Sequence, residues 1–472
     1  MKLMLFAPEL LLLLGSLLIF LFTLNSAAKN ARNTAIAVGI AAILLCLTSL
    51  HQSGSLFYKA YQIDLFSQLF KLLIALATTC VLIFGRDLKD IADRMKPEYY
   101  LFLLLSSLGL MMLVSSVELI TLFVALELSS FSLYLMVPMR DDRQGLRSQM
   151  EAGIKYILFA VMATGIMLFG MSYLFGLTGS TYLVDIAPRL TQLITEPAAI
   201  VGIAMVLSGF LFKLAVFPFH FWVPDVYQGA SNETTSFIAS VPKLGAVAIL
   251  IRITMLAAPE GTAVVKMLVI CAVCSMFYGN LAALVQKDIK RLLGFSGIAH
   301  AGFVLLGLLT LQQEGYATSI FYIVGYVIMN MACFLVICKV SRGGENVAIA
   351  DLGGLYKRSP LMAFTLATGM MALAGIPPFV GFMGKFMLMA GALQADHLPL
   401  VILAALNTAI AIYYYLSIVK VTYCDAPVAT DTLEVDFATK VVSLLLIVAI
   451  ITMGVLPSQM LDIANRAVAA IL

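Results

Sequence analysis

Several acidic and basic side chains stand deep inside long apolar stretches of this sequence. Glu127 lies in the middle of one run, Lys213 follows a stretch of apolar and small residues, and Lys243 and Lys385 interrupt two further runs. Each such charge costs at least about 2.5–3.5 kcal/mol at the centre of a bilayer, so an apolar residue would be more stable there. The pattern therefore indicates that the charges are used, and proton transfer is the chemistry that suits them.

Glu127 and Lys213 are candidates for a working pair. Lys213 precedes Pro218 by five residues, and proline removes a backbone hydrogen bond, so it frees a carbonyl beside the lysine. Burial disfavours a charged lysine and a nearby carboxylate favours it, so such a pair can switch protonation as it opens or closes. The alternatives are a static salt bridge for Lys213 and a helix-packing hydrogen bond for Glu127. For Lys243 and Lys385 the alternative is a side chain that snorkels to the membrane surface.

Two histidines and one further lysine are candidates for supporting roles. Histidine can carry a proton near neutral pH, and His220 and His300 both lie in apolar runs, although a lone histidine is more often structural. Neither has metal-ligand spacing with another His, Cys or Glu, so we expect no metal and no cofactor in this chain. Lys155 follows Glu151 by four residues, the spacing of a plain helix salt bridge; the alternative is that it leans inward toward the Glu–Lys pair.

The elements that must position these residues are membrane helices. Of the 472 residues, 62% are hydrophobic and only 12% are charged, whereas soluble domains carry roughly 25% charged residues. The apolar runs are continuous rather than alternating, so helices and not barrel strands satisfy the backbone in lipid. Formal net charge is +3, and no basic run suits nucleic acid. We expect an all-α membrane protein with about 14 transmembrane helices.

Two of the predicted spans, the seventh and the twelfth, are too long for one straight crossing and contain prolines, so we expect both to be broken. The predicted limits are 4–24, 34–50, 63–84, 98–116, 119–138, 150–177, 197–226, 234–257, 263–285, 291–311, 316–339, 359–394, 398–423 and 438–458.

The two breaks share a short pattern. Leu214-Ala215-x-x-Pro218 matches Leu373-Ala374-x-x-Pro377, five spans further on, and an odd shift reverses the direction of the chain across the membrane. Transporters place ion sites at broken helices in such inverted repeats. We therefore expect two inverted five-helix repeats. The predicted division is 1–97 for helices 1–3, 98–257 and 258–424 for the two repeats, and 425–472 for helix 14.

Basic residues gather in alternate loops. Cytoplasmic loops carry the excess of Lys and Arg, so the bias predicts that both termini lie on the outer side. The inner loops then hold Lys29, Arg32, Arg86, Lys89, Arg94, Lys96, Arg140, Arg143, Arg147, Lys287, Lys290, Arg291, Lys339, Arg342, Lys357, Arg358, Lys420 and Lys440, and the outer side only Lys2, Lys59, Arg189, Lys266 and Arg466.

The candidate residues come from five different spans. If both repeats face a common axis, Glu127, Lys213, Lys243, His300 and Lys385 form a polar line through the middle of the membrane. Such a line suits protons that hop through water and side chains, and not a bulky solute. A free-standing solute transporter and a purely structural scaffold are the alternatives from other classes.

Three segments form long and specific motifs: Pro218-Phe-His-Phe-Trp-Val-Pro-Asp-Val-Tyr-Gln-Gly-Ala230, Ile289-Lys-Arg-Leu-Leu-Gly-Phe-Ser-Gly-Ile-Ala-His300 and Leu373-Ala-Gly-Ile-Pro-Pro378. They resemble the antiporter-like subunits of respiratory complex I, and the likeness extends from about the third span to the last. The Pro-Asp-Val-Tyr-Gln-Gly form is typical of one of the three sister subunits. One segment departs from the family, which usually runs Pro-x-Pro where this chain has Ser231-Asn-Glu-Thr-Thr235, so Glu233 adds a charge near the start of the eighth span.

The resemblance implies a fold with two inverted five-helix repeats and broken helices 7 and 12. It implies proton pumping coupled to electron transfer in other subunits, with matching positions at Glu127, Lys213, Lys243, His300 and Lys385. NADH, flavin, iron–sulfur clusters and quinone would then belong to other parts of the complex. The implied partners are the other membrane subunits, the sister antiporter-like subunits included, and the lipid of a bacterial inner membrane. A subunit of a cation/proton antiporter or of a membrane-bound hydrogenase-type complex is the alternative.

Overall fold

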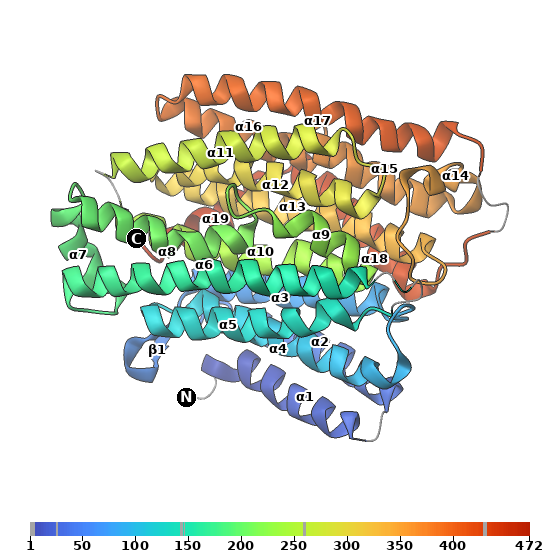
Figure 1. The fold of residues 1–472 in the computed structure, drawn as a ribbon, viewed down its shortest axis with the longest axis horizontal. Coiled ribbons are helices and arrows are strands. Elements are labelled where there is room, and N and C mark those ends of the chain that lie inside the picture. The colour runs from blue at the N-terminus through green and yellow to red at the C-terminus, as the bar shows by residue number, and fades with distance from the viewer. Residues whose placement is uncertain (1–4, 25–26, 142–144, 146, 258–260, 428–431) are drawn as a thin grey trace.

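The protein is an all-α membrane protein whose helices lie side by side (Figure 1). The computed structural model describes residues 5–24, 27–141, 145, 147–257, 261–427 and 432–472. In these residues, 12 helices are long and apolar enough to cross a membrane, and α1, α15 and α16 are shorter apolar helices. Met4, the predicted start of the first span, lies outside the described residues, as do Lys2 and Arg143.

The helices follow the predicted spans to within a few residues at most ends. Polar caps begin several of them: the Asp64 carboxylate accepts a hydrogen bond from the backbone N–H of Ser67, and Ser231 Oγ accepts one from that of Thr234. The helices are α1 (Ala7–Thr23), α2 (Ala28–Ser49), α3 (Leu65–Phe84), α4 (Lys96–Ser115), α5 (Leu119–Met136), α6 (Ser148–Thr178), α7 (Leu183–Leu193), α8 (Pro197–Leu214), α9 (Trp222–Gly229), α10 (Asn232–Thr254), α11 (Thr262–Ala283), α12 (Ile289–Leu308), α13 (Gln313–Val340), α14 (Leu355–Arg358), α15 (Pro360–Ala374), α16 (Val380–Gln394), α17 (Leu398–Cys424), α18 (Phe437–Val455) and α19 (Ser458–Ala469).

The chain breaks at both places where the prolines predicted it. α8 ends at Leu214, and Ala215 adopts a left-handed backbone with φ of 71° before α9 begins. α15 ends at Ala374, and Gly375 has φ of 87° before α16 begins. Glycine accepts this conformation readily, whereas it is uncommon for alanine, so the turn at Ala215 is held by the packing around it.

Three helices form the centre of the molecule. α10 is buried along its whole length, and α12 and α13 are almost entirely buried. They lie between α1 at one edge and α17 at the other (Figure 1). Most of the surfaces of α2, α6, α17 and α18 are exposed in the isolated chain. Because these exposed surfaces are apolar, they suit lipid or neighbouring membrane subunits.

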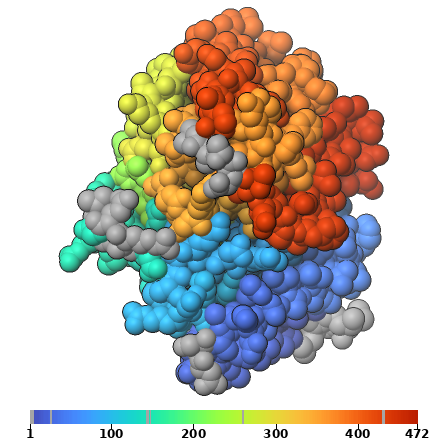
Figure 2. All heavy atoms as spheres, turned by 90° about the vertical axis from the view of Figure 1, so that its right-hand side faces the viewer, coloured from blue at the N-terminus to red at the C-terminus, as the bar shows by residue number. Residues whose placement is uncertain are grey.

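The loops that join the helices lie in two groups, one at each end of the molecule, and loops of the same group contact one another. At one end, backbone bridges join Ile91 to Arg140 and Asp288 to Ala348. These loops and the helix ends beside them carry most of the residues that the basic bias assigned to the inner side. Figure 2 faces this end, with the first helices in blue and the last in orange to red. Both chain termini lie toward the other end, with β1 and α7 (Figure 1).

Three elements escaped the sequence analysis. A short antiparallel hairpin pairs β1 (Gly54–Leu56) with β2 (Tyr61–Ile63) and is bridged from Tyr61 to Ser116. The helices α7 and α19 are short and carry one apolar face each. Such elements are below the length of a span, so a search for continuous apolar runs passes over them.

Candidate functional site

Lys213 is buried at the end of α8, and its ammonium donates a hydrogen bond to Ser130 Oγ at 2.9 Å. Ser130 lies three residues after Glu127 on α5, and residues at this spacing share a helix face. Among the described residues no direct ion pair joins Glu127 to Lys213, and Glu127 Oε1 has no hydrogen-bond partner. Lys213 is therefore bonded to the residue that lies one turn of α5 after the half-buried Glu127. It lies near Glu127 but forms no ion pair with it.

In the part of the chain that the structure describes, no carbonyl at the first break accepts a hydrogen bond from Lys213, contrary to our expectation; its ammonium donates to the Ser130 side chain instead. The Phe212 carbonyl accepts hydrogen bonds from the backbone N–H of Ala215 and from Trp222 Nε1, at 3.0 and 3.1 Å. The Trp222 indole on α9 also packs on the Phe212 ring, with centroids 5.4 Å apart.

The second break holds its lysine in the way expected for the first. Lys385, on α16, donates to the carbonyls of Leu373 and Ala374 at 3.0 and 3.1 Å, across the break. These are among the last carbonyls of α15, which have no partner within the helix. The ammonium also lies 5.0 Å from the centre of the Phe303 ring. Lys385 is buried, and the C-terminal end of α15 favours its charge.

Lys243 and His300 belong to one cluster of aromatic and hydroxyl groups on α10, α12, α13 and α17. Lys243 Nζ lies 3.1 Å from Tyr326 Oη and 4.8 Å from the centre of the same ring. The Tyr326 ring lies 5.1 Å from the His300 ring. His300 contacts Tyr322 Oη through Nδ1 at 2.7 Å and Tyr415 Oη through Nε2 at 3.1 Å. His300 is thus held on both sides by hydroxyls that can donate or accept a proton.

The Tyr322 ring continues the cluster toward Lys385. It lies 6.3 Å from the Phe303 ring, which in turn lies beneath the Lys385 ammonium. The structure therefore brings Lys243, His300 and Lys385 into one buried region.

Lys155 turns away from the Glu–Lys pair. Its ammonium lies 2.7 Å from Glu151, as the spacing indicated, and 2.7 Å from Asp225 on α9. Arg291 contacts the other oxygen of Asp225 at 2.8 Å. Lys155 therefore joins α6 to the second half of the broken helix, on a partly exposed surface, and does not lean toward Glu127 or Lys213.

His220 lies apart from the polar cluster. Its ring is buried against Phe221 and Tyr278, with centroids 4.3 Å away in each case. Neither ring nitrogen has a hydrogen-bond partner in the part of the chain that the structure describes. The geometry places His220 in an aromatic packing position, which was the structural alternative.

A buried ion pair that the sequence analysis missed joins the first and third helices. Lys71 lies 2.7 Å from Glu9, both side chains are completely buried, and Tyr61 Oη donates to Glu9 at 2.6 Å. Glu9 stands near the start of its apolar run, where a charge is ordinarily interfacial. Lys71 lies within the third predicted span, and this lysine in an apolar run was the signal by which the sequence could have revealed the pair.

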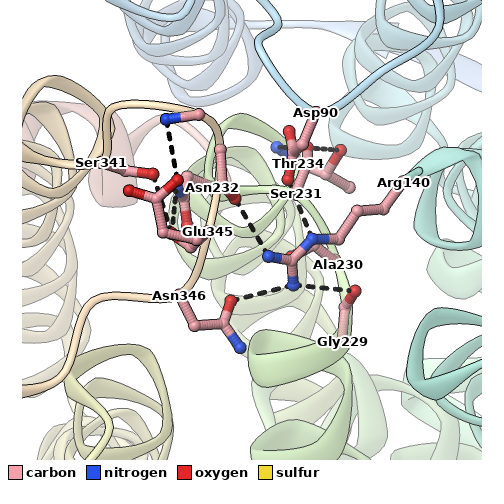
Figure 3. A network of polar contacts seen from close by, with 12 residues as sticks. Asp90, Arg140, Gly229, Ala230, Ser231, Asn232, Thr234, Ser341, Glu345 and Asn346 are labelled. Atoms are coloured by element: carbon pink, nitrogen blue, oxygen red, sulfur yellow. Dashed lines mark hydrogen bonds and ion pairs between the residues drawn. The ribbon is translucent and has the colours of Figure 1, made fainter. Parts of the chain in front are cut away.

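The loops that the basic bias assigns to the inner side are joined by a polar network centred on Arg140 (Figure 3). Arg140 pairs with Asp90 at 2.9 Å and donates to Asn346 Oδ1 at 2.9 Å and to the Gly344 carbonyl at 3.0 Å. Its remaining contacts are with the carbonyls at the end of α9. The network ties the loops after α3, α5 and α13 to the start of α10.

Two carboxylates in these loops are stabilised in the charged form. Partial burial opposes ionisation of Glu345, but backbone N–H groups, including those of Arg342 and Gly343, hold the pKa of Glu345 below its usual range. Partial burial likewise opposes ionisation of Asp436. The hydrogen bonds from Thr439 and the nearby charge of Lys339 nevertheless lower the pKa of Asp436 to about 2.

Lys290, which the basic bias assigned to an inner loop, does not lie at the surface. It is completely buried and donates to the Ala230 carbonyl at 2.8 Å. Its neighbour Arg291 remains partly exposed.

Comparisons with known proteins place this geometry in a family. The family described as NADH:quinone oxidoreductase/Mrp antiporter, TM, matches residues 116–411. A relative from Opitutus terrae named NADH-quinone oxidoreductase subunit N 2 is 53% identical over 99% of this chain and 98% of its own. A chain of respiratory complex I from Thermus thermophilus superposes with a TM-score of 0.83 at 29% identity, over 96% of this chain and 98% of that one. A chain of the Mrp complex from Dietzia sp. shares the fold, with a TM-score of 0.87 at 21% identity over 99% and 97% of the two chains.

The fold with two broken helices and buried lysines thus defines an antiporter-like membrane protein. More closely, the chain belongs to the family of NADH-quinone oxidoreductase subunit N. This is the subunit that the Pro-Asp-Val-Tyr-Gln-Gly form indicated.

Proposed function

We propose that this chain is the proton-translocating membrane subunit N of an NADH-quinone oxidoreductase. Glu127, Lys213, Lys243 and Lys385 carry the proton transfers, with His300 as the link between the last two. The cluster that runs from Lys243 through Tyr326, His300 and Tyr322 toward Lys385 is the observation that carries this proposal. A structural role alone gives no reason for so many protonatable groups to meet in the buried centre of a membrane protein.

A change of charge or hydration in neighbouring subunits starts each cycle. It biases Glu127 and Lys213 first, then Lys243, then Lys385. Lys213 suits the first position because its ammonium is hydrogen-bonded to a neutral hydroxyl, which restrains the charge weakly. Protons load from the inner side and leave on the outer side.

The chain takes part in a translocase without catalysing a redox step itself. NADH, flavin, iron–sulfur clusters and quinone are held by other subunits of the complex. The partners are the other membrane subunits, including the two sister antiporter-like subunits. The exposed apolar faces of α2, α6, α17 and α18 are the surfaces that such partners and lipid would cover.

The protein lies in the bacterial inner membrane with both termini on the outer side. The joined loops that carry Arg86, Arg140 and Arg342 then face the inner side. Residues 98–257 and 258–424 form inverted repeats, each with one broken helix, and 1–97 and 425–472 flank them. The likeness of the breaks after α8 and α15 supports this division.

The test replaces Lys213 by alanine in the assembled complex. Lys213→Ala should lower NADH–quinone activity and proton pumping sharply, while the NADH–ferricyanide reaction of the peripheral subunits stays largely intact. Lys266→Ala is the matched control, since Lys266 lies on the membrane helix α11 with an exposed side chain. Full coupled activity in Lys213→Ala would count against the proposal.

A cation/proton antiporter subunit is the second candidate, because the Mrp chain shares the whole fold. The 53% identity with a subunit N relative favours the first reading. Purification of the tagged chain separates them, since copurifying subunits with NADH oxidation activity are expected only for the oxidoreductase.

A further inference from the structure

One face of α10 carries a line of polar side chains from the inner loops to Lys243. Glu233, Ser236, Ser240 and Lys243 are spaced three, four and three residues apart, so they lie on one face of the helix. The helix rises 1.5 Å per residue, so the line is about 15 Å long. It begins in the segment where this chain departs from the usual Pro-x-Pro pattern.

The line is buried, and three of its oxygen atoms have no hydrogen-bond partner among the described residues. Glu233 is 4% exposed, and Ser236 and Ser240 are completely buried. In the described residues, Glu233 Oε2 and the hydroxyl oxygens of Ser236 and Ser240 have no hydrogen-bond partner. Buried polar atoms require partners, and water supplies them where a site is polar. Three such atoms in succession on one helix face mark a path for water, since a packed helix interface would use apolar residues there.

The start of the line adjoins the network in Figure 3, where Asn232 and Thr234, the neighbours of Glu233, are labelled. Asp90 and Lys290 act electrostatically on Glu233. Lys290 is itself buried and bonded to the Ala230 carbonyl, at the end of α9. Glu233 therefore lies where these loops meet the membrane helices, close enough to Asp90 for that carboxylate to oppose its negative charge and to Lys290 for that ammonium to favour it.

We propose that Glu233 is the inner-side proton acceptor for Lys243, and that Ser236 and Ser240 hold the water between them. This inference rests on the proposed function and names its uptake site. The Glu233 carboxylate takes a proton from the inner aqueous phase. The proton passes along the water and hydroxyl line to the neutral amine of Lys243, which becomes an ammonium, and Glu233 returns to the carboxylate. No electron moves, and the charge gained at Lys243 is the proton taken up.

The test uses the whole complex reconstituted in liposomes. Glu233→Gln should lower coupled NADH–quinone turnover and proton pumping by about tenfold, since it removes a proton-transfer group. Glu233→Asp should retain most of the activity. Glu233→Ala should recover activity when formate is added, because the small acid can occupy the vacated space. A merely structural glutamate would give no recovery with formate.

Three companion variants make the outcome decisive. Glu314→Gln is the matched control and should be silent, since Glu314 occupies the same second position of α13 but is exposed. Ser240→Ala tests the line without touching the carboxylate and should slow turnover several-fold, so the proposal stays testable if Glu233→Gln does not assemble.

Lys243→Ala is measured in parallel. If it abolishes pumping while Glu233→Gln and Ser240→Ala pump normally, the uptake inference is wrong and the proposed function stands. If Lys243→Ala also pumps normally, the proposed function itself fails.

Discussion

The ammonium of Lys385 lies 3.0 Å from the carbonyl oxygen of Leu373, across the break between α15 and α16. At the first break, Lys213 reaches only a serine hydroxyl. The two lysines are therefore restrained differently, although both lie at the C-terminal end of a helix, where a positive charge is favoured. Lys385 is tied to two backbone carbonyls, and Lys213 is bonded to a neutral hydroxyl. This asymmetry suits a sequence of transfers in which one lysine gives up its proton more readily than the other.

Lys385→Arg should separate charge from proton transfer. Arginine can still donate to the two carbonyls of α15, but it is not deprotonated in proteins. We expect a complex that assembles normally and whose proton pumping falls by about tenfold or more. Pumping by reconstituted complex, normalised to the NADH–ferricyanide reaction, is the measurement. Normal pumping would mean that a fixed charge at this position suffices.

Tyr322→Phe should weaken the link between His300 and Lys385. The change removes the hydroxyl that contacts His300 Nδ1 and leaves the ring in place. Coupled turnover should fall several-fold with little change in assembly. Tyr316→Phe is the control, because Tyr316 is buried on the same helix and its hydroxyl has no partner among the described residues. Equal effects of the two changes would remove Tyr322 from the path.

The spans and both breaks were predictable because their signals are local. Continuous apolar runs mark helices, and the prolines at 218 and 377 interrupt them. The positions of Lys213, Lys243 and Lys385 inside those runs were equally visible. Their partners were not, since Ser130 and Tyr326 are ordinary helix residues until the helices pack together. The carbonyl contact expected of Lys213 occurs at Lys385, and sequence could not show that Lys213 would turn to a serine on α5 instead.

Charges near the ends of apolar runs were the least predictable. Lys290 adjoins Arg291 and has the pattern of a surface anchor, yet it is buried. Whether such a residue faces water depends on how the loops after α5 and α13 fold over it, which is a tertiary property. For the same reason, the contact of Lys155 with Asp225 spans 70 residues and left no mark in local spacing.

Gly297→Ala should disturb Lys243. A Cβ atom at this position would lie 2.9 Å from both Lys243 Nζ and Tyr326 Oη, so the lysine or the tyrosine must move. We expect lower coupled turnover with a normal amount of assembled complex. Gly391→Ala is the control, since a Cβ atom there meets nothing within 4 Å and alanine favours the helix. Turnover is measured for both variants in membranes of equal complex content; unchanged turnover in Gly297→Ala would show that Lys243 tolerates displacement.

The buried pair of Glu9 and Lys71 should stabilise the first three helices only as a pair. Removing one partner leaves an uncompensated charge with no exposure, which costs about 3–5 kcal/mol in buried pairs. Replacing both by apolar residues of similar size removes the charge and its desolvation together. We therefore expect Glu9→Gln and Lys71→Met each to lower the thermal stability of the purified complex, and Glu9→Met/Lys71→Met to be more stable than Lys71→Met alone. Tyr61→Phe, which keeps the pair and removes one hydrogen bond, should have a smaller effect of about 1 kcal/mol. Additive losses in the double variant would show that the two charges are stabilised separately, by groups other than each other.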